Sequence, residues 1–249
     1  FVREYPVLTF ASGPTNSMRG AAFLSGLKDA LVIDVGGTTS DIGMLQGGFP
    51  RVASQAVSIG GVRTNFRMPD VYSFGLGGGS MVAEEPLQVG PQSVGYELTK
   101  KGLVFGGNVL TTTDVIVAAG AQGIGDPSRV ASLSRTTVER VMDRIEDMIN
   151  ISIERMKTSA ESVPVIAVGG GSILIVRPIA GAKSVETPEH FACANAIGAA
   201  IAQVGGEVDR IFSLDKLSRD EALAEAKQEA TNKAVEDRKS TRLNSSHRT

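Results

Sequence analysis

The chain has 249 residues, of which 42% are hydrophobic and 21% charged, so it is long enough to bury the core of one large domain. A net charge of -2 argues against a nucleic-acid or anionic-membrane surface, and no apolar run reaches the roughly 18 residues that a membrane helix needs. One cysteine and two histidines exclude a disulfide framework and a Cys/His zinc site. The composition predicts a cytoplasmic protein.

The first predicted elements are a helix and a β-hairpin. Residues 12–28 have a helical pattern with small residues at its centre. Residues 31–35 (LVIDV) are a short apolar run that ends in glycine, which predicts a buried strand, and residues 42–45 (IGML) predict a second one. The Gly/Thr-rich residues 36–39 between them predict a hairpin tip, and residues 50–62 predict a third strand.

The middle of the chain changes from short strands to a long helix. Residues 63–112 predict short strands and glycine turns, and residues 113–121 a short apolar helix. Residues 136–158 predict the clearest helix, with Thr136 and Glu139 as its capping box. Its predicted core stripe consists of Val138, Val141, Met142, Ile145, Ile149, Ile153 and Met156.

Strands and helices then alternate, which predicts a mixed α/β layered domain. Residues 165–168 predict a buried strand that runs into a glycine turn, and residues 190–204 an Ala-rich helix in which Cys193 is a buried small hydrophobe. Ser218 and Glu221 predict the start of a last helix.

The end of the chain is set apart. Residues 237–247 read DRKSTRLNSSH, which matches the translation of a sequencing-library adapter. We therefore expect residues 1–236 to form the domain and residues 237–249 to be a disordered, non-natural tail.

The hairpin tip carries the strongest chemical signal. Glycines such as Gly36 and Gly37 let backbone N–H groups approach an anion, and the hydroxyls of Thr38 and Thr39 can donate to phosphate oxygens. Asp34 and Asp41 would repel bare phosphate, so their presence calls for a cation such as Mg²⁺, which binds one or two carboxylates and keeps its waters. A plain Gly-Thr turn with aspartate as turn former is equally compatible with these residue types.

Two further glycine runs are weaker signals. Gly169, Gly170, Gly171 and Ser172 follow a predicted strand and would let a flat or anionic ligand lie against the backbone. The run GGGS at residues 77–80 has no clear strand-to-helix transition around it. The chain has neither a P-loop motif nor a G-x-G-x-x-G after its first predicted strand.

These runs resemble a known family when they are taken in order. Residues 34–41 (DVGGTTSD) are similar to the D-x-G-G-T-x-x-D signature of the actin, sugar-kinase and heat-shock chaperone ATPase superfamily. The S-G-P…G-A-A run of residues 12–22, SFGLGGGS at 73–80, VGPQSVG at 89–95 and the T-D of residues 113–114 resemble hydantoinase/oxoprolinase A subunits. The resemblance covers residues 5–215.

The resemblance implies an actin-like (ribonuclease H-like) α/β ATPase fold with a mixed sheet flanked by helices. It implies that ATP phosphorylates the carbonyl oxygen of a cyclic amide such as hydantoin or 5-oxoproline, and that a B-type hydantoinase subunit or domain is the partner. Asp34 and Asp41 would then be catalytic, with Asp34 facing the metal. Residues 36–39 would hold the phosphates, and residues 169–172 would border the adenosine.

The sequence departs from the family pattern in two ways. The family's first lobe, with its own glycine hairpin, is expected to be missing, so we expect this piece alone to be inactive and poorly soluble. Residues 96–101 (YELTKK) replace the family's usual acidic, proline- and cysteine-containing segment, which leaves the substrate open. The alternatives are an ATP-dependent ketone carboxylase subunit and a non-catalytic nucleotide-binding actin-like module.

Overall fold

This computed structural model describes residues 9–54, 58–59, 61–63, 68–203, 205–206, 208–215 and 217–245. The chain divides into two compact units, Phe1–Ile201 and Ala202–Thr249. The division that the sequence suggests, at residue 236, stays a prediction.

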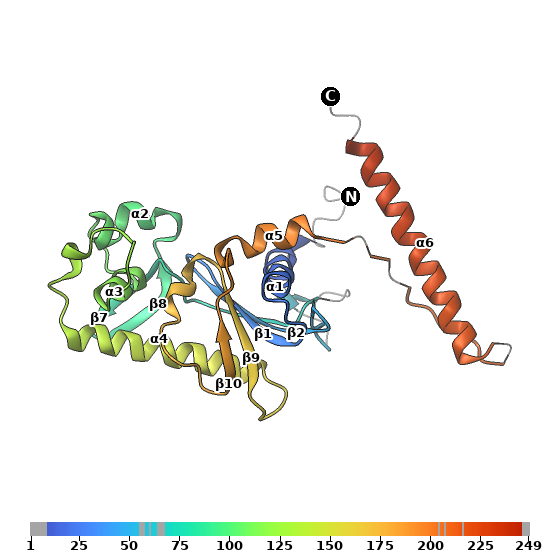
Figure 1. Cartoon of the computed structure of the whole chain (residues 1–249), viewed down its shortest axis with the longest axis horizontal. Coiled ribbons are helices and arrows are strands. Elements are labelled where there is room, and N and C mark those ends of the chain that lie inside the picture. The colour runs from blue at the N-terminus through green and yellow to red at the C-terminus, as the bar shows by residue number, and fades with distance from the viewer. Residues whose placement is uncertain are drawn as a thin grey trace. The chain divides into compact units, whose positions relative to one another are not determined.

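The first unit is built on a mixed sheet (Figure 1). Its strands lie in the order β10-β9-β1-β2-β3, and β6 also pairs with β2. β9 is parallel to both of its neighbours, whereas β2 is antiparallel to β1, β3 and β6. The strands of this sheet are β1 (Ala30–Val35), β2 (Ser40–Gln46), β3 (Phe49–Pro50), β6 (Val71–Phe74), β9 (Val163–Val168) and β10 (Ala182–Glu186).

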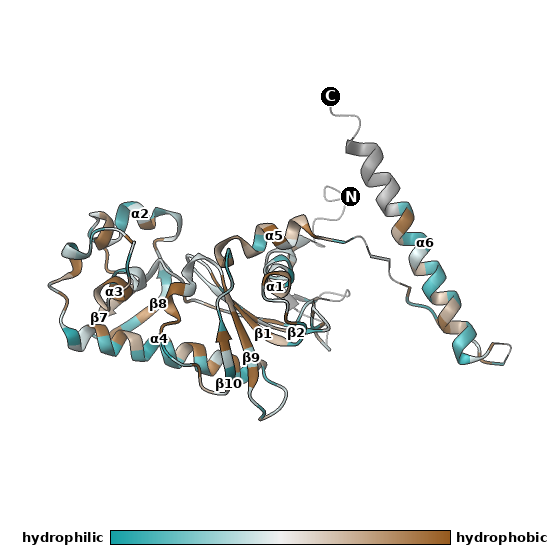
Figure 2. Cartoon of the chain, viewed as in Figure 1, coloured by the Kyte–Doolittle hydropathy of each residue, from teal (hydrophilic) through white to brown (hydrophobic). Residues whose placement is uncertain are grey.

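Helices cover both faces of this sheet. On one face, α3 (Thr112–Ala118) and α4 (Arg135–Met156) bury a cluster that includes Leu31, Ile33 and Val35 of β1. On the other face, α1 (Ser12–Ser25) and α5 (Ala194–Ala200) pack near Ala30 and Val32 of the same strand. Figure 2 shows the hydrophobic colour concentrated on β1 and β9, as expected for strands that are buried on both faces.

Smaller elements complete the two units. The first unit also contains the short hairpins β4 (Ser58–Ile59) with β5 (Val62–Arg63) and β7 (Ser80–Glu84) with β8 (Leu87–Ser93). Further helical turns among its described residues are η2 (Gly95–Glu97), α2 (Leu98–Lys101), η3 (Leu103–Phe105), η4 (Pro127–Val130), η5 (Gly170–Leu174) and η6 (Phe191–Cys193). The second unit contains α6 (Arg219–Ser245).

The first helix and the hairpin follow the sequence-based expectation. α1 ends three residues earlier than predicted because Gly26 adopts a left-handed conformation (φ 73°) and donates its N–H to Ala22. β1 and β2 form the predicted antiparallel hairpin, with Asp34 paired to Asp41. In the expected strand at 50–62, Pro50 lies in β3, Ser58 and Ile59 form β4, and Val62 begins β5; residues 55–57 and 60 lie outside the described part.

The long helix α4 has the predicted core stripe but a different cap. Val138, Val141, Ile145, Ile149, Ile153 and Met156 are buried, and Met142 packs against them. The predicted Thr136/Glu139 capping box is wrong: the side chain of Ser134 accepts the N–H of Thr137, and Glu139 pairs with Arg135 instead. The first helical residue is therefore one position earlier than predicted.

The Ala-rich segment departs furthest from its prediction. The expected helix at 190–204 is only α5, preceded by the turn η6, and Cys193 is exposed rather than buried. Cys193 is exposed because it is the N-cap residue of α5 and precedes the part of the helix that packs against α1. The last helix does start as predicted, since Ser218 and Glu221 exchange hydrogen bonds. It runs to Ser245, past residue 237, and the origin of that tail stays a prediction.

Candidate functional site

The tip of the β1–β2 hairpin is an open backbone turn. Gly37, Thr38 and Thr39 are exposed, and the N–H of Gly36 donates to the carbonyl of Thr39 at 2.9 Å. The tip is narrow because Val35 pairs with Ser40 directly below it.

A second glycine turn orients the peptides of the tip. Gly78 N–H donates to the carbonyl of Gly36 at 3.0 Å, and Gly79 N–H to the carbonyl of Gly37 at 2.7 Å. The carbonyl and the N–H of one trans peptide point in opposite directions, so the next two N–H groups of the tip, those of Gly37 and Thr38, point away from this turn. This leaves two adjacent donors directed to the open side, which is the arrangement of an anion-binding nest.

The fit between these two segments requires glycine. A Cβ at Gly77 would lie 2.5 Å from the backbone nitrogen of Thr38, and a Cβ at Gly79 2.9 Å from the carbonyl oxygen of Gly37. Thr112 and Thr113 of α3 fix the turn from behind, with hydroxyls that donate to the carbonyls of Gly77 and Gly78. The run that had the weakest sequence signal is thus the immediate support of the hairpin tip.

The predicted glycine turn after β9 also packs against this hairpin. A Cβ at Gly169, which has φ 84°, would lie 2.2 Å from Oδ1 of Asp34, and one at Gly171 2.4 Å from the carbonyl oxygen of Gly36. Gly170 is exposed, whereas Ser172 is only 5% exposed and its hydroxyl has no hydrogen-bond partner within the described residues. The structure therefore brings residues 34–41 and 169–172 together, with Ser172 turned inward.

Asp34 is the charged group at the centre of the site. It lies on β1 beside the hairpin tip and is partly buried. Burial raises the pKa of its carboxyl, a hydrogen bond with the side chain of Ser17 lowers it, and the charge of Asp41 raises it. Asp41 is its cross-strand partner and accepts a hydrogen bond from the hydroxyl of Ser73 on β6.

These two carboxylates fit a magnesium ion that completes its shell with water and phosphate. Burial is the main cause of the raised pKa of Asp34 and the charge of Asp41 a lesser one, and a bound cation would offset both. Among the described residues no group of three or more His, Cys, Asp or Glu side chains could hold a metal by itself. Mg²⁺ needs only one or two carboxylates besides substrate oxygens, so Asp34 and Asp41 suffice for it.

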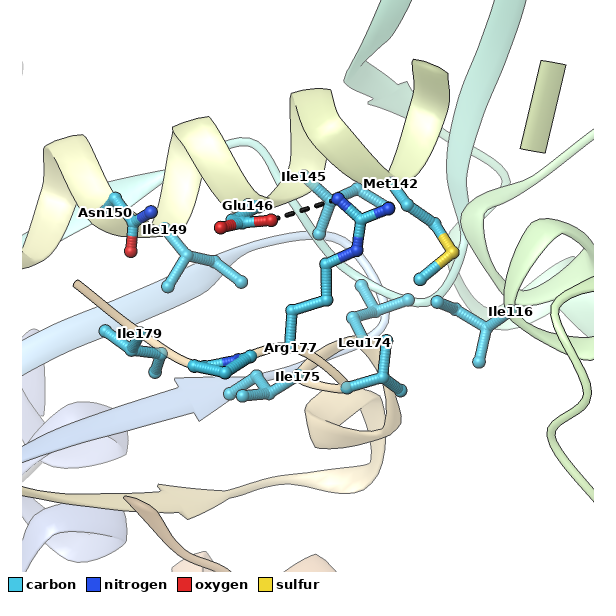
Figure 3. Close-up of a pocket in the computed structure, with 12 residues that line it drawn as sticks. Ile116, Met142, Ile145, Glu146, Ile149, Asn150, Leu174, Ile175, Arg177 and Ile179 are labelled. Carbon is cyan, nitrogen blue, oxygen red and sulfur yellow. Dashed lines mark hydrogen bonds and ion pairs between the residues drawn. The ribbon is translucent and has the colours of Figure 1, made fainter. Parts of the chain in front are cut away.

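A separate apolar hollow lies beyond the glycine turn on the α4 face of the sheet. It encloses only about 20 Å³ and is lined by α4, by Ile116 and by the segment from Leu174 to Ile179. Figure 3 shows the side chain of Arg177 crossing this hollow to Glu146, with which it pairs at 3.0 Å. Arg177 also pairs with Asp143 at 2.5 Å, so its charge is already compensated.

Sequence reasoning missed the side chains that reach the tip from distant segments. Ser17 of α1, Ser73 of β6 and Ser93, whose hydroxyl donates to the carbonyl of Gly37 at 3.2 Å, have no motif of their own. Only the resemblance of residues 12–22, 73–80 and 89–95 to the family pattern pointed to these segments, and it gave these serines no role. Across the described part of the chain, no helix is long and apolar enough to span a membrane.

Solved structures show which fold this is. The chain superimposes on the ATP-dependent acetone carboxylase in its nucleotide-free state with a TM-score of 0.65 at 19% identity, over 91% of this chain and 38% of that one. It superimposes on the ATP-dependent caprolactamase from Pseudomonas jessenii with a TM-score of 0.63 at 22% identity, over 88% and 38%. The fold is that of an actin-like ATPase.

Sequence comparisons identify the family. The caprolactamase α subunit of Pseudomonas jessenii is 26% identical over 212 residues, which are 80% of this chain and 29% of that protein. An uncharacterized protein of Schizosaccharomyces pombe is 29% identical over 163 residues, 60% of this chain and 13% of that protein. The chain thus spans less than a third of the curated relatives it matches. The family model for hydantoinase/oxoprolinase matches residues 2–168, and the chain belongs to this family.

Proposed function

We propose that the chain supplies one nucleotide-binding wall of an ATP-dependent enzyme that opens a cyclic amide of the hydantoin or 5-oxoproline type. The observation that carries the proposal is the hairpin tip, whose two outward N–H groups stand beside a partly buried carboxylate. Backbone donors fixed in advance stabilise the charge of a transferring phosphoryl group without reorganisation.

Each part of the site has a role in this proposal. Residues 36–39 hold the phosphates, and Asp34 binds Mg²⁺ with Asp41 beside it. The ion, when bound, neutralises the charge of the phosphates and fixes their orientation. Gly169, Gly170 and Gly171 border the adenosine. Ser172 shapes the turn from inside rather than touching the nucleotide.

The proposed reaction makes a poor electrophile reactive. The amide carbonyl oxygen attacks the γ-phosphorus of ATP, and the bond from that phosphorus to ADP breaks. Water adds to the activated carbon, the ring C–N bond breaks, and the nitrogen takes a proton. A second water splits the resulting acyl phosphate into carboxylate and phosphate. The chain's own residues bind and orient the phosphoryl donor in this sequence.

Partners and alternatives follow from the same site. The relative from Pseudomonas jessenii is an α subunit, which supports a partner subunit of the B type for this chain.

Nothing at the hairpin tip selects an amide over a ketone, and the acetone carboxylase has the same fold, so a ketone carboxylase subunit is the second candidate. A non-catalytic nucleotide switch is the third; it predicts that Asp34→Ala leaves function intact while nucleotide still binds.

The test is phosphate release from Mg-ATP by the complete protein, with and without a B-type partner. Hydantoin, 5-oxoproline and caprolactam are added separately, and acetone with bicarbonate forms the other arm. Stimulation by a cyclic amide, with about one phosphate released per ring opened, is the expected result. Stimulation only by acetone with bicarbonate moves the assignment to a carboxylase. ATP binding with no turnover in any arm contradicts both enzymes and supports the switch.

A further inference from the structure

Two parallel chains of hydrogen bonds connect the first turn of α3 with the hairpin tip. In the first chain, the hydroxyl of Thr112 donates to the carbonyl of Gly77 at 2.6 Å. The N–H of the same peptide is that of Gly78, and it donates to the carbonyl of Gly36 at 3.0 Å. The peptide of the Gly36 carbonyl in turn carries the N–H of Gly37, which is one of the two donors on the open side of the tip.

The second chain repeats this arrangement one residue further along. The hydroxyl of Thr113 donates to the carbonyl of Gly78 at 2.7 Å. The N–H of that peptide, which belongs to Gly79, donates to the carbonyl of Gly37 at 2.7 Å. The peptide of the Gly37 carbonyl carries the N–H of Thr38, the other donor on the open side. Each threonine is therefore connected through two peptides to one N–H group of the anion-binding nest.

The two glycine carbonyls would have a hydrogen-bond partner without these hydroxyls. The carbonyl of Gly77 also accepts the N–H of Ser80 at 3.0 Å. The carbonyl of Gly78 also accepts the backbone N–H of Thr113 at 3.1 Å. Peptides that adjoin glycines can rotate with little steric hindrance, so a second donor on each carbonyl narrows the range of their orientations. The hydroxyls therefore fix a direction rather than satisfy an otherwise unpaired group.

The location of both threonines keeps them away from any bound nucleotide. Thr112 is 0% and Thr113 2% exposed, and the glycine turn lies between them and the hairpin tip. Hydrogen bonds in such a buried environment are stronger than in water, and successive bonds in a chain polarise one another. An effect of these hydroxyls on a ligand must therefore pass through the two peptides of each chain.

We propose that Thr112 and Thr113 are positioning residues that hold the backbone N–H groups of Gly37 and Thr38 in the direction in which they bind the phosphates of ATP. The inference rests on the proposed function, because it concerns the same phosphate site. Since the residues act on the phosphate donors alone, they should affect the binding of the phosphates and leave the binding of adenosine unchanged.

The test measures the affinity of the complete protein for Mg-AMPPNP, a non-hydrolysable nucleotide, and for adenosine, both by calorimetry. Thr112→Val and Thr113→Val keep the branched side chain and replace the hydroxyl by a methyl group. Each variant is expected to lose about three- to tenfold in affinity for Mg-AMPPNP, the equivalent of one hydrogen bond, and to bind adenosine as wild type does. Thr112→Ser and Thr113→Ser keep the hydroxyl and should restore the affinity for Mg-AMPPNP.

Ser152→Ala is the matched control for the loss of a buried hydroxyl. Ser152 is 3% exposed, and its hydroxyl donates to the carbonyl of Met148 at 2.7 Å within α4, away from the glycine turn. Like the two valine variants, it should unfold at a lower temperature than wild type, because a buried hydrogen bond is lost. Its affinity for Mg-AMPPNP should nevertheless equal that of wild type.

The outcomes separate this inference from the proposed function. If wild type binds Mg-AMPPNP and the valine variants bind it equally well, only the positioning role is overturned. An equal loss for adenosine, or a loss that the serine variants do not restore, also overturns it, because either pattern indicates a general structural role. If wild type itself does not bind Mg-AMPPNP, the proposed function fails and this inference fails with it.

Discussion

The two faces of the central sheet differ in chemistry, although strand β1 contributes residues to both. On the α4 face, Leu31, Ile33 and Val35 of β1 bury themselves in an aliphatic core. On the α1 face the alternate residues begin equally apolar, with Ala30 and Val32, but end in Asp34 at the hairpin tip. The alternation of a strand thus places one carboxylate beside polar helix residues, while its neighbours on the strand anchor it in the core.

This difference teaches where stability and where function reside. The α4 face can hold β1 rigid because it is apolar and close-packed. The α1 face carries the unfavourable groups of the site, a partly buried carboxylate and a second carboxylate opposite it. Changes on the α1 face should therefore alter function more than stability, and changes on the α4 face the reverse.

The largest expected effect comes from Asp34→Asn. Turnover should fall about 10²- to 10³-fold, as is typical when a fixed electrostatic group is removed from a phosphoryl-transfer site. The variant should nevertheless unfold at a temperature about 2 °C higher than wild type at pH 7 in EDTA. The measurements are phosphate release and differential scanning calorimetry.

The stabilisation has a definite pH dependence. Burial, with Asp41 adding to it, raises the pKa of Asp34 above its value of 3.8 in the unfolded chain, so the folded state binds this proton more tightly. Wild-type stability therefore falls as the pH rises from 3.8 through the raised pKa. Asp34→Asn has no carboxyl at this position, so its stability does not fall for this reason. The gain should vanish as the pH approaches 3.8; a gain that is the same at every pH would contradict this cause.

The next largest effect comes from Gly77→Ala. The added Cβ would lie 2.5 Å from the backbone nitrogen of Thr38, so the hairpin tip and its supporting turn must separate. A displacement of this order should weaken Mg-AMPPNP binding about 100-fold. Gly13→Ala is the control, because a Cβ there meets nothing within 4 Å. Equal affinities of the two variants for Mg-AMPPNP would contradict the proposed close fit of Gly77 against Thr38.

Asp114→Ala tests the support on the α4 face. Asp114 is fully buried and accepts the N–H of Val104 and both donors of Thr111, each at 2.8 Å. Leaving these buried donors unpaired should lower the free energy of unfolding by about 2–4 kcal/mol, seen in the urea midpoint. Asp126→Ala removes an exposed cap and should cost at most about 1 kcal/mol. A smaller loss for Asp114 than for Asp126 would refute the account of this face.

The sequence alone predicted those parts of the fold that have a local signal. The apolar run 31–35 ending in glycine located β1 and the tip, and the stripe from Val138 to Met156 located α4. The cap of α4 was misplaced because Ser134 and Thr136 both have a polar residue three positions later, and spacing alone does not choose between them. β10 was not predicted, because an exposed edge strand has no apolar pattern.

The part of the candidate site that is contiguous in sequence could be predicted from a local signal, and the resemblance to the family added residues 169–172. Asp34, Asp41 and residues 36–39 share one hairpin, so their meeting follows from a local turn. The approach of Gly77 to Thr38 and of Asn195 to Ser17 joins positions far apart in the chain and depends on tertiary packing. Cys193 was misjudged for the same reason: whether it faces α1 depends on where α5 begins.

The most direct test of the central claim is a crystal structure of the complete protein with Mg-AMPPNP. The account predicts phosphate oxygens within hydrogen-bond distance of the backbone N–H groups of Gly37 and Thr38, and Mg²⁺ beside the carboxylate of Asp34. A nucleotide bound elsewhere, with the hairpin tip in contact only with solvent, would contradict it.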